Sequence, residues 1–394
     1  MPAPYRIMPV YGTRPEAIKM APLILALKDA PQLEDIVVVT GQHREMLDQV
    51  NEVFGIVPDM DLDIFEHGMS LNGVIEKTLS RLGPLLQSEA PDAVVVQGDT
   101  TSALAAGLAA FNAGIPVIHL EAGLRTASIA SPFPEEGNRR LLSQITRLHL
   151  APTPASRQNL LRSGVPAEDI VIAGNTVIDA LHVATAGERE FLEPALRDSE
   201  RLSGRVVLVT SHRRESWGDP MRRTASALAR LATERPDVTF VFPLHANPRV
   251  REIFEPVLGD QSNVILTESL AYPDLALMLA RADIVVTDSG GIQEEAPALG
   301  KPVLVLREDT ERPEAIDAGT ARLVGTDPDL IVSEVHSLLD DPAAYEAMAM
   351  AVNPFGDGRA AERSVAAISA YFGEGERMVD FDPHQSNESR GPRK

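Results

Sequence analysis

Short apolar runs alternate with segments of helical period through the first half of the chain. The apolar runs cover residues 7–10, 36–39, 93–96, 117–120 and, more briefly, 170–172. Continuous apolar strands joined by helices are typical of a doubly wound parallel sheet, whose strands are buried on both faces. We therefore expect a Rossmann-like domain over residues 1–174.

The second half of the chain repeats this architecture. Its apolar runs cover residues 206–209, 239–242, 264–266, 284–286, 303–306 and 322–324. They predict a second Rossmann-like domain over residues 175–357, with the polar strand ends of the two sheets facing across a cleft. A helix over residues 358–372 is expected to cross back to the first domain. Residues 373–394 are polar and aperiodic, so we expect a disordered tail.

Composition narrows the class of protein. With 394 residues, 44% of them hydrophobic, the chain is long enough for two cored domains. Its net charge of −21 argues against nucleic acid or an anionic membrane as a partner, so an anionic ligand would need local basic residues. The absence of cysteine removes disulfides and thiolate metal sites. No signal peptide or membrane-length apolar run is visible, and we expect a cytoplasmic protein.

The most informative stretch follows the apolar run at residues 284–286. Ser289-Gly290-Gly291 predicts a tight turn, with a helix from Ile292 onward. Two glycines let the main chain approach a ligand closely, and the helix N-terminus carries partial positive charge, which favours a phosphate or diphosphate. Glu294 and Glu295 either complement the helix macrodipole or hold ribose hydroxyls.

The helix after the first strand carries both structural and chemical candidates. Thr13 and Glu16 have the spacing of a capping box, which accounts for them without any ligand. Arg14 and Lys19 are not explained in this way. They lie in the opening turns of the helix, at the carboxyl end of the strand, where a diphosphate would be met.

Carboxylates follow two further strands of the first half. Asp99 comes after the third strand and either caps the next helix or takes part in chemistry. His119 and Glu121 share one face at the end of the fourth strand. Glu135 and Arg139 then lie in a proline-stiffened loop and helix start, where glutamates often only complement the helix dipole.

Eight blocks of the sequence together resemble one family, the non-hydrolysing UDP-N-acetylglucosamine 2-epimerases, and they occur in family order across roughly residues 7–372. The blocks are Gly12-Thr-Arg-Pro-Glu-Ala-Ile-Lys19-Met-Ala-Pro22, Gln42-His-Arg-Glu-Met-Leu47, Gly98-Asp-Thr-Thr101, Glu121-Ala-Gly-Leu-Arg-Thr126, Gly174-Asn-Thr-Val-Ile-Asp179, His212-Arg-Arg-Glu-Ser216, Asp288-Ser-Gly-Gly-Ile-Gln-Glu-Glu-Ala-Pro297 and Thr310-Glu-Arg-Pro-Glu314. The resemblance implies a GT-B-like fold of two Rossmann-type domains. It also implies a homodimer that interconverts UDP-N-acetylglucosamine and UDP-N-acetylmannosamine without NAD or an obligatory metal.

The resemblance also implies roles for individual residues. The nucleotide would be held by Arg14, Ser289, Gly290, Gly291, Glu295, Arg312 and His245, with the glutamate on ribose. Catalysis or sugar contact is implied for Lys19, Asp99, Glu121, Glu135, Arg139 and His212. A second, allosteric site would involve Gln42, His43 and Arg213. The chain departs from the family pattern at Gln97, Phe133 and Ser211, where His, Trp and Gly are common, and these changes affect the shape of the sugar pocket.

The implied chemistry is an elimination, because C2 of a pyranose has no adjacent carbonyl to acidify its proton. UDP would leave C1 as the C2 proton is lost, giving a 2-acetamidoglucal, and would add back with protonation from the opposite face. This route needs a base and an acid on opposite sides of the ring. Which of Asp99, Glu121 and Glu135 takes each role stays open. The product would supply N-acetylmannosamine-type sugars for cell-surface polysaccharide or amino-sugar synthesis.

Three alternatives remain at the level of the sequence. A GT-B glycosyltransferase would share the nucleotide site but transfer the sugar to an acceptor. A non-catalytic nucleotide-sugar sensor would bind without turnover. A metal hydrolase would use His119, Glu121, His212 and His245, although buried or ligand-contacting histidines explain the same residues.

Overall fold

The chain folds into two α/β units in a computed structural model that describes residues 3–41, 44–66, 68–187, 189–198 and 200–384. Unit 1 contains residues 3–183 and 355–384, and unit 2 contains residues 184–354. Each unit has its own parallel sheet, so the predicted class of two doubly wound parallel-sheet domains is confirmed. The first crossing between units lies within a helix at residue 183, later than the boundary expected at residue 174.

The sheet of unit 1 has the strand order β4-β3-β1-β5-β6-β7-β8, with β2 paired to β1. Its strands are β1 Tyr5–Tyr11, β2 Leu33–Asp35, β3 Val38–Val39, β4 Met60–Asp61, β5 Ala93–Gln97, β6 Val117–Leu120, β7 Leu148–Ala151 and β8 Ile170–Ile172. Its helices are α1 Arg14–Lys28, α2 Arg44–Phe54, α3 Leu71–Glu89, α4 Thr101–Asn112, α5 Glu135–Ile145, α6 Pro154–Arg162, α7 Thr176–Thr185 and α15 Ala360–Tyr371. Because β1, β5 and β6 are neighbours, their carboxyl ends bring the residues after Tyr11, Gln97 and Leu120 to one edge of the sheet.

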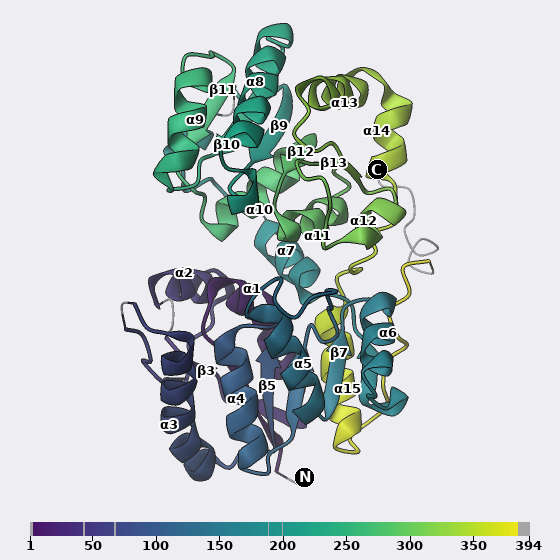
Figure 1. The fold of residues 1–394 in the computed structure, drawn as a ribbon. Coiled ribbons are helices and arrows are strands. Elements are labelled where there is room, and N and C mark those ends of the chain that lie inside the picture. Colours follow the sequence, from purple (N-terminus) through teal and green to yellow (C-terminus); the bar gives the residue numbers. More distant parts are fainter. Residues whose placement is uncertain (1–2, 42–43, 67, 188, 199, 385–394) are drawn as a thin grey trace. The chain divides into compact units, whose positions relative to one another are not determined.

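Helices cover both faces of the unit 1 sheet. The helices α3, α4 and α5 pack in sequence on one face, and α1 packs with α2 and α15. Figure 1 shows α15, drawn in yellow, beside β7 within unit 1. The buried core between sheet and helices includes Val94, Val96, Leu82 and Leu142. The helix over residues 360–371 thus packs on unit 1.

The sheet of unit 2 has the strand order β11-β10-β9-β12-β13-β14, all parallel. Its strands are β9 Arg205–Thr210, β10 Val238–Pro243, β11 Val264–Thr267, β12 Ile284–Thr287, β13 Val303–Val305 and β14 Ala321–Leu323. Its helices are α8 Asp219–Glu234, α9 Pro248–Leu258, α10 Tyr272–Arg281, α11 Gly290–Ala298, α12 Pro313–Asp317, α13 Pro328–Asp340 and α14 Pro342–Ala349. The strands β9 and β12 are central neighbours, so the segments after Thr210 and Thr287 lie side by side.

The tail differs from the expectation of disorder, at least as far as residue 384. Phe381 is 2% exposed, its backbone N–H donates to the carbonyl of Ile172 over 2.7 Å, and its ring lies under the Arg363 guanidinium. A carboxylate oxygen of Asp380 accepts a hydrogen bond from the Ile172 N–H over 3.0 Å. The buried Phe381 ring and these hydrogen bonds together hold this segment against unit 1. Residues 385–394 lie outside the described part of the chain.

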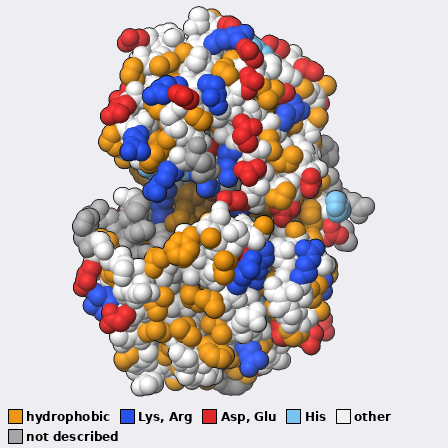
Figure 2. All heavy atoms as spheres, in the orientation of Figure 1, with side chains coloured by type: hydrophobic (Ala, Val, Ile, Leu, Met, Phe, Trp, Pro, Cys, Tyr) orange, Lys and Arg blue, Asp and Glu red, His pale blue; other side chains and the backbone are white. Residues whose placement is uncertain are grey.

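The surface is of mixed charge despite the acidic total. On the face drawn in Figure 2, basic and acidic side chains are interspersed over both units. Among the described residues, none of the helices is both long and apolar enough to span a bilayer.

Candidate active site

Glu121 is the most constrained side chain at the strand ends of unit 1. It follows β6 directly and adopts a left-handed backbone conformation with φ of 63°, which is uncommon for a residue with a side chain. One carboxylate oxygen, Oε1, is ion-paired with Lys19 and accepts a hydrogen bond from Asn175 Nδ2 over 3.2 Å. The other, Oε2, accepts a hydrogen bond from Gln97 Nε2. Three side chains from different elements thus hold a single carboxylate in a strained position.

Gly123 fixes the path of the chain just after this carboxylate. Its φ is 96°, and a Cβ built there would lie 2.4 Å from the carbonyl oxygen of Ser156. Only glycine fits so close to another backbone. The turn that leaves β6 is therefore determined by the sequence, and Glu121 is held immediately before it.

Asp99 is paired with Arg139 rather than used as a helix cap. Its Oδ2 lies 2.8 Å from Nε and 2.6 Å from an Nη of Arg139, and Asn138 Nδ2 donates to its backbone carbonyl over 2.8 Å. The N-cap of α4 is Thr100, whose hydroxyl accepts from the Ala103 N–H. The capping explanation for Asp99 is therefore wrong.

The two glutamates that open α5 have different environments. Glu136 is buried and accepts hydrogen bonds from Arg140 over 2.7 Å and from the Thr126 N–H over 3.0 Å. Burial raises its pKa, but these hydrogen bonds and the neighbouring arginine charges outweigh that effect and hold the pKa below its usual value. Glu135 is half-buried, and no hydrogen bond or ion pair engages its carboxylate within the described residues. Glu136 is structural, whereas Glu135 remains available to a ligand.

Glu16 and Arg14, close together in α1, show the same contrast between a structurally engaged side chain and one that is available to a ligand. Glu16 is buried and accepts hydrogen bonds from the N–H groups of Gly12 and Thr13, over 2.9 and 2.7 Å, and from the Thr100 hydroxyl over 2.6 Å. It ties the ends of β1 and β5 together. Arg14 is half-buried, and no acceptor or carboxylate engages its guanidinium in the described part of the chain. It is a cation at the strand ends without a structural task.

His119 is a buried structural residue. Its Nε2 lies 2.7 Å from the carbonyl oxygen of Gly98, so this nitrogen carries a proton and donates. Burial lowers its pKa to about 4, and the ring is neutral at physiological pH. Across residues 3–384, apart from the gaps already given, no group of three or more His, Asp or Glu side chains is arranged to hold a metal ion.

In unit 2, the glycines after β12 are helical. The sequence predicted a tight turn with a helix from Ile292, but α11 begins at Gly290, with Ser289 as its N-cap residue in an extended conformation. The turn is shorter because the Ser289 N–H donates to the hydroxyl of Thr287 over 2.9 Å, which completes the change of direction before the glycines. Both glycines therefore contribute N–H groups to the first turn of the helix, where an anion is favoured.

Two arginines lie at this helix N-terminus. A Cβ built on Gly290 would lie 3.5 Å from an Nη of Arg213 and 4.0 Å from the guanidinium carbon of Arg312. Arg213 had been assigned to a possible second site together with Gln42 and His43, and these two residues lie outside the described part of the chain. Two guanidinium groups and a helix N-terminus together form a strongly anion-binding corner of unit 2.

The acidic pair in α11 separates into two functions. Glu294 is 2% exposed and ion-paired with Arg312, so it positions that arginine. Glu295 lies on the side of Gly291, where a built Cβ would be 3.7 Å from its Oε2. Burial and then the charge of Glu295 raise the pKa of Tyr272 well above its usual value. Of the two glutamates, Glu295 is the one placed beside the glycine backbone.

His212 and His245 stand at the ends of the adjacent strands β9 and β10. Their rings stack with centroids 5.8 Å apart and an interplanar angle of 14°. Nδ1 of His212 lies 3.0 Å from Oδ1 of Asp288, which is not among the predicted site residues. The sequence position of Asp288 could have identified it as a site residue, because it is the first residue after β12 and comes shortly before the glycines.

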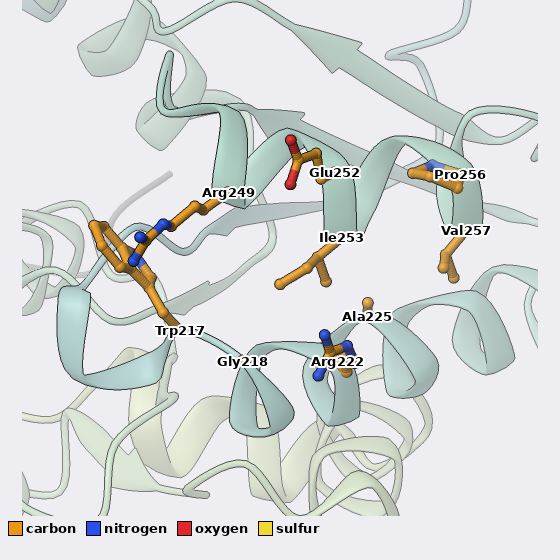
Figure 3. A pocket seen from close by; sticks show the side chains of 9 residues that line it. All are labelled: Trp217, Gly218, Arg222, Ala225, Arg249, Glu252, Ile253, Pro256 and Val257. Atoms are coloured by element: carbon orange, nitrogen blue, oxygen red, sulfur yellow. The ribbon is translucent and has the colours of Figure 1, made fainter.

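A groove on unit 2 lies apart from these residues. It runs between α8 and α9, has a volume of about 750 Å³, and is lined by residues that include Trp217, Arg222, Arg249 and Ile253 (Figure 3). The Arg249 guanidinium lies 5.0 Å from the centre of the Trp217 ring. None of the residues that line this groove is among the predicted site residues.

Comparison with known proteins gives a consistent result. Residues 25–369 match the model of the family described as UDP-N-acetylglucosamine 2-epimerase. The UDP-N-acetylglucosamine 2-epimerase of Salmonella typhimurium is 49% identical over 375 residues, which covers 93% of this chain and 99% of the relative. A crystal structure of a UDP-N-acetylglucosamine 2-epimerase superposes with a TM-score of 0.89 at 44% identity, covering 96% of this chain and all of the other.

Two further structures are informative for ligand and fold. The enzyme from Neisseria meningitidis bound to UDP-N-acetylglucosamine has a TM-score of 0.82 and 43% identity, over 93% of this chain and 100% of that one. A glycosyltransferase of kitacinnamycin is similar in fold, with a TM-score of 0.61, at 16% identity over 93% of this chain and 100% of that one. The second likeness concerns the GT-B-like fold and carries no information on activity.

Proposed function

The chain belongs to the UDP-N-acetylglucosamine 2-epimerase family, and from this premise we propose that it inverts C2 of UDP-N-acetylglucosamine to give UDP-N-acetylmannosamine. The observation that carries the proposal is the constrained carboxylate of Glu121, held by Lys19, Gln97 and Asn175 in a left-handed conformation. Strain of this kind persists where the surroundings impose it, and it is concentrated at functional sites.

The reaction proceeds by elimination and re-addition. A base takes the proton from C2, the C1–O bond breaks, and its electron pair leaves with UDP, so that a C1–C2 double bond remains in a 2-acetamidoglucal. UDP then adds back to C1 while an acid protonates C2 from the opposite face. The route needs two proton-transfer groups and cations for the charge that develops on the diphosphate, and it balances without a redox cofactor.

Unit 1 supplies the proton-transfer groups in this proposal. Glu121 is ion-paired with Lys19, Asp99 is ion-paired with Arg139, and Glu135 is half-buried at the start of α5. These three carboxylates have three different environments, and such differences are how a protein assigns the roles of acid and base. Lys19 and Arg139 neutralise two of these carboxylates, Glu121 and Asp99 respectively. The assignment of acid and base among the three stays open.

Unit 2 supplies the nucleotide contacts in this proposal. The first N–H groups of α11, from Gly290 and Gly291, bind the diphosphate together with the Arg213 and Arg312 guanidinium groups, and Ser289 adds a hydroxyl. Glu295 accepts the ribose hydroxyls. Arg14 of unit 1 is a further cation for the diphosphate, since no carboxylate among the described residues neutralises it. His212 and His245 contact the substrate from the ends of β9 and β10.

Turnover of UDP-N-acetylglucosamine as the sole substrate tests the proposal. Nuclear magnetic resonance of the reaction mixture should show UDP-N-acetylmannosamine accumulating to a fixed ratio, with small amounts of UDP and the glycal at high enzyme concentration. A glycosyltransferase would leave the UDP-sugar intact until an acceptor is added. A nucleotide-sugar sensor would bind it without turnover at any enzyme concentration. Either of these results would refute the proposed epimerisation.

We further propose that the enzyme is a homodimer and that its product feeds the synthesis of N-acetylmannosamine-type sugars. The support is membership of the family, not an interface visible in the single chain. Sedimentation equilibrium at micromolar concentration should give twice the chain mass of 42.5 kDa. A monomer under those conditions would contradict the proposed dimer and leave the epimerase reaction untouched.

A further inference from the structure

Asp288 is a fully buried carboxylate between two strand ends of unit 2. It follows β12, whose neighbour in the sheet is β9, and its side chain is 0% exposed. Its Oδ2 accepts hydrogen bonds from the N–H groups of His212 and Arg213, over 2.7 and 2.8 Å, and from the hydroxyl of Ser211 over 3.3 Å. A buried carboxylate needs such partners, because its desolvation is costly. One oxygen of Asp288 is therefore committed to the backbone of the loop that follows β9.

The second oxygen of Asp288 faces the ring of His212. Oδ1 lies 3.0 Å from Nδ1, within ion-pair distance although the angles are not those of a hydrogen bond, and a carboxylate so close favours a proton on Nδ1. Burial raises the pKa of Asp288, but the contact with the His212 ring and the hydrogen bonds from the two backbone N–H groups outweigh it and hold the pKa below its usual value. The carboxylate is thus ionised at neutral pH and can act as an acceptor throughout the reaction.

The tautomer of His212 follows from this contact. With the proton on Nδ1, the neutral ring presents Nε2 as an acceptor, and a protonated ring presents Nε2–H as a donor with the Asp288 carboxylate as counter-ion. The His212 side chain is 39% exposed while Asp288 is buried behind it. The stacked ring of His245 limits rotation from the other side, and Nδ1 of His245 accepts a hydrogen bond from the Asn247 N–H over 3.1 Å.

We propose that Asp288 is the positioning residue of His212: it holds the ring by Nδ1–H, so that Nε2 faces the diphosphate of the substrate and donates to it when the ring is protonated, with Asp288 as the counter-ion. This inference rests on the proposed function of the site. Asp288 itself is too deeply buried to touch the substrate, and it acts through the histidine. The arrangement resembles in logic the aspartate that orients a catalytic histidine in hydrolases, where the amide variant retains the geometry and imposes the wrong tautomer.

Asp288→Asn is the variant that separates the orientation of the His212 ring from the anchoring of the loop after β9. The side-chain oxygen of asparagine can still accept from the N–H groups of His212 and Arg213, while its NH₂ group would face Nδ1 and move the ring proton to Nε2. We expect kcat to fall by about 10² to 10⁴-fold, the range of a general acid or base, with the affinity for UDP within about threefold of wild type. Asp288→Ala removes the loop anchor as well, so both kcat and UDP affinity should fall.

A double-mutant cycle with His212→Ala tests whether Asp288 works through the histidine. In the His212→Ala background, adding Asp288→Asn should change kcat by less than about threefold, because there is no ring left to orient. A loss of kcat in that background equal to the loss in wild type would overturn the proposal. So would a single variant Asp288→Asn with kcat within about twofold of wild type.

Asp274 offers a matched control in the same unit. It is 2% exposed, and its two carboxylate oxygens accept from the N–H groups of Leu192 and Glu193, each over 2.8 Å. Like Asp288 it is a buried carboxylate that anchors backbone, but no histidine is bound to it in the described structure. Asp274→Asn should lower the melting temperature by an amount similar to Asp288→Asn and leave kcat of the folded protein unchanged.

The ring tautomer can also be read without any variant of Asp288 and without turnover. In protein labelled with ¹⁵N-histidine, the His212 signals are identified by their loss in His212→Ala. At a pH where the ring is neutral, they should show a protonated Nδ1 and an unprotonated Nε2. A predominant Nε2–H tautomer would overturn the proposal even if Asp288→Asn failed to fold. An inactive wild-type enzyme with the expected tautomer would instead indicate that the proposed function is wrong and the positioning right.

Discussion

At the scale of single residues, the same side-chain type serves the fold at one position and the chemistry at the next. Glu16 and Glu136 are buried glutamates whose oxygens are occupied by backbone N–H groups and neighbouring side chains. Glu121 lies at the same strand ends as Glu16, but its partners are Lys19, Gln97 and Asn175, and its backbone is left-handed. The structural glutamates and the proposed catalytic one thus differ in their partners.

Glu121→Gln is the residue-level prediction for the proton transfer. The amide keeps the shape and can still accept from Gln97, but it cannot take or give the C2 proton and it leaves Lys19 without its counter-charge. We expect kcat to fall by about 10² to 10⁴-fold with little change in UDP affinity, since Glu121 is not among the residues proposed to hold the nucleotide. Steady-state kinetics and UDP titration calorimetry measure the two quantities.

Glu16→Gln is the matched control for that variant. It makes the same chemical change at the same sheet edge, and burial already raises the pKa of Glu16, so the neutral form is tolerated there. We expect a modest loss of stability and a kcat within about threefold of wild type. If Glu16→Gln lost as much activity as Glu121→Gln, the division between structural and catalytic carboxylates would be wrong.

The sequence could identify most of these residues but not all their roles. The strand-end positions of Lys19, Asp99 and Glu121 follow from apolar runs and the rule that ligands meet the carboxyl ends of parallel strands. Pairings such as Asp99 with Arg139 connect elements far apart in the chain, and periodicity carries no information on them. The role of Asp288 could not be predicted for the same reason, because its hydrogen-bond partners lie in the loop after a different strand.

At the scale of elements, strands that coincide with an uninterrupted apolar run were predictable, and strands without one were not. All six strands of the unit 2 sheet lie at predicted runs. In unit 1 the strand β7 was missed, because Leu148–Ala151 contains a histidine and follows α5 after only two residues, without a turn signal. The strand β4, Met60–Asp61, has two residues and no apolar run at all. Such strands form because their neighbours in the sheet supply the hydrogen bonds.

Helix α11 yields a prediction in which stability and binding change in opposite directions. Neither Gly290 nor Gly291 has a positive φ, and a Cβ on Gly291 would meet only Glu295, at 3.7 Å. Gly291→Ala should therefore raise the free energy of unfolding by up to about 1 kcal/mol, because alanine restricts the unfolded chain. The same methyl group would lie beside Glu295 against the proposed nucleotide, so UDP should bind at least about tenfold more weakly.

Gly83→Ala in α3 is the control for that prediction. Gly83 is also helical, and a Cβ there would meet nothing within 4 Å. Because Pro84 follows Gly83 and its ring crowds a Cβ on the preceding helical residue, we expect a smaller gain in stability than for Gly291→Ala by denaturant unfolding, with no change in UDP affinity by calorimetry. Unchanged UDP affinity in Gly291→Ala would contradict the assignment of the α11 N-terminus as the diphosphate site.

The start of α15 makes the stability of unit 1 dependent on pH. Asp179 of α7 accepts from the N–H groups of Ala360 and Ala361, over 3.3 and 2.9 Å, and burial is the main cause that raises its pKa to about 6. Because the folded-state pKa is above the unfolded value, the folded protein binds more protons between about pH 4 and pH 6. Raising the pH through this window therefore lowers the contribution of Asp179 to stability.

Asp179→Asn should remove this dependence. Relative to wild type, the variant should gain free energy of unfolding as the pH rises from 4 to 7, by up to about 3 kcal/mol for a shift of this size. Asp357 differs from Asp179 because its pKa is shifted in the opposite direction. Burial raises its pKa, but the two contacts with Arg363, both at 2.8 Å, outweigh burial and lower it, so Asp357→Asn should lose most stability at neutral pH. Because the pKa of Asp357 is lowered, its window lies below about pH 4, so the loss in Asp357→Asn should stay constant from pH 4 to pH 7. Urea unfolding across this pH range that showed equal slopes for both variants would contradict the assignment.

At the scale of the whole molecule, each unit carries one part of the proposed chemistry. Unit 1 holds the carboxylates Asp99, Glu121 and Glu135, and unit 2 holds the helix N-terminus with Arg213 and Arg312. The two sheets have similar parallel order, but the residues proposed for the chemistry differ between them. Carboxylates proposed for proton transfer lie at the strand ends of unit 1, and the helix N-terminus and arginines proposed for the diphosphate lie at those of unit 2, which suits a reaction that moves a proton on a sugar and a charge on a diphosphate.

The most direct test of the account is exchange of the C2 proton in heavy water. UDP-N-acetylglucosamine incubated with the enzyme alone in D₂O should acquire deuterium at C2, in both the product and the recovered substrate, as each re-addition draws its proton from solvent. Mass spectrometry and the collapse of the C2 proton signal measure it. Interconversion of the two UDP-sugars with the original C2 proton fully retained would contradict proton abstraction by these carboxylates, and with it the proposed elimination.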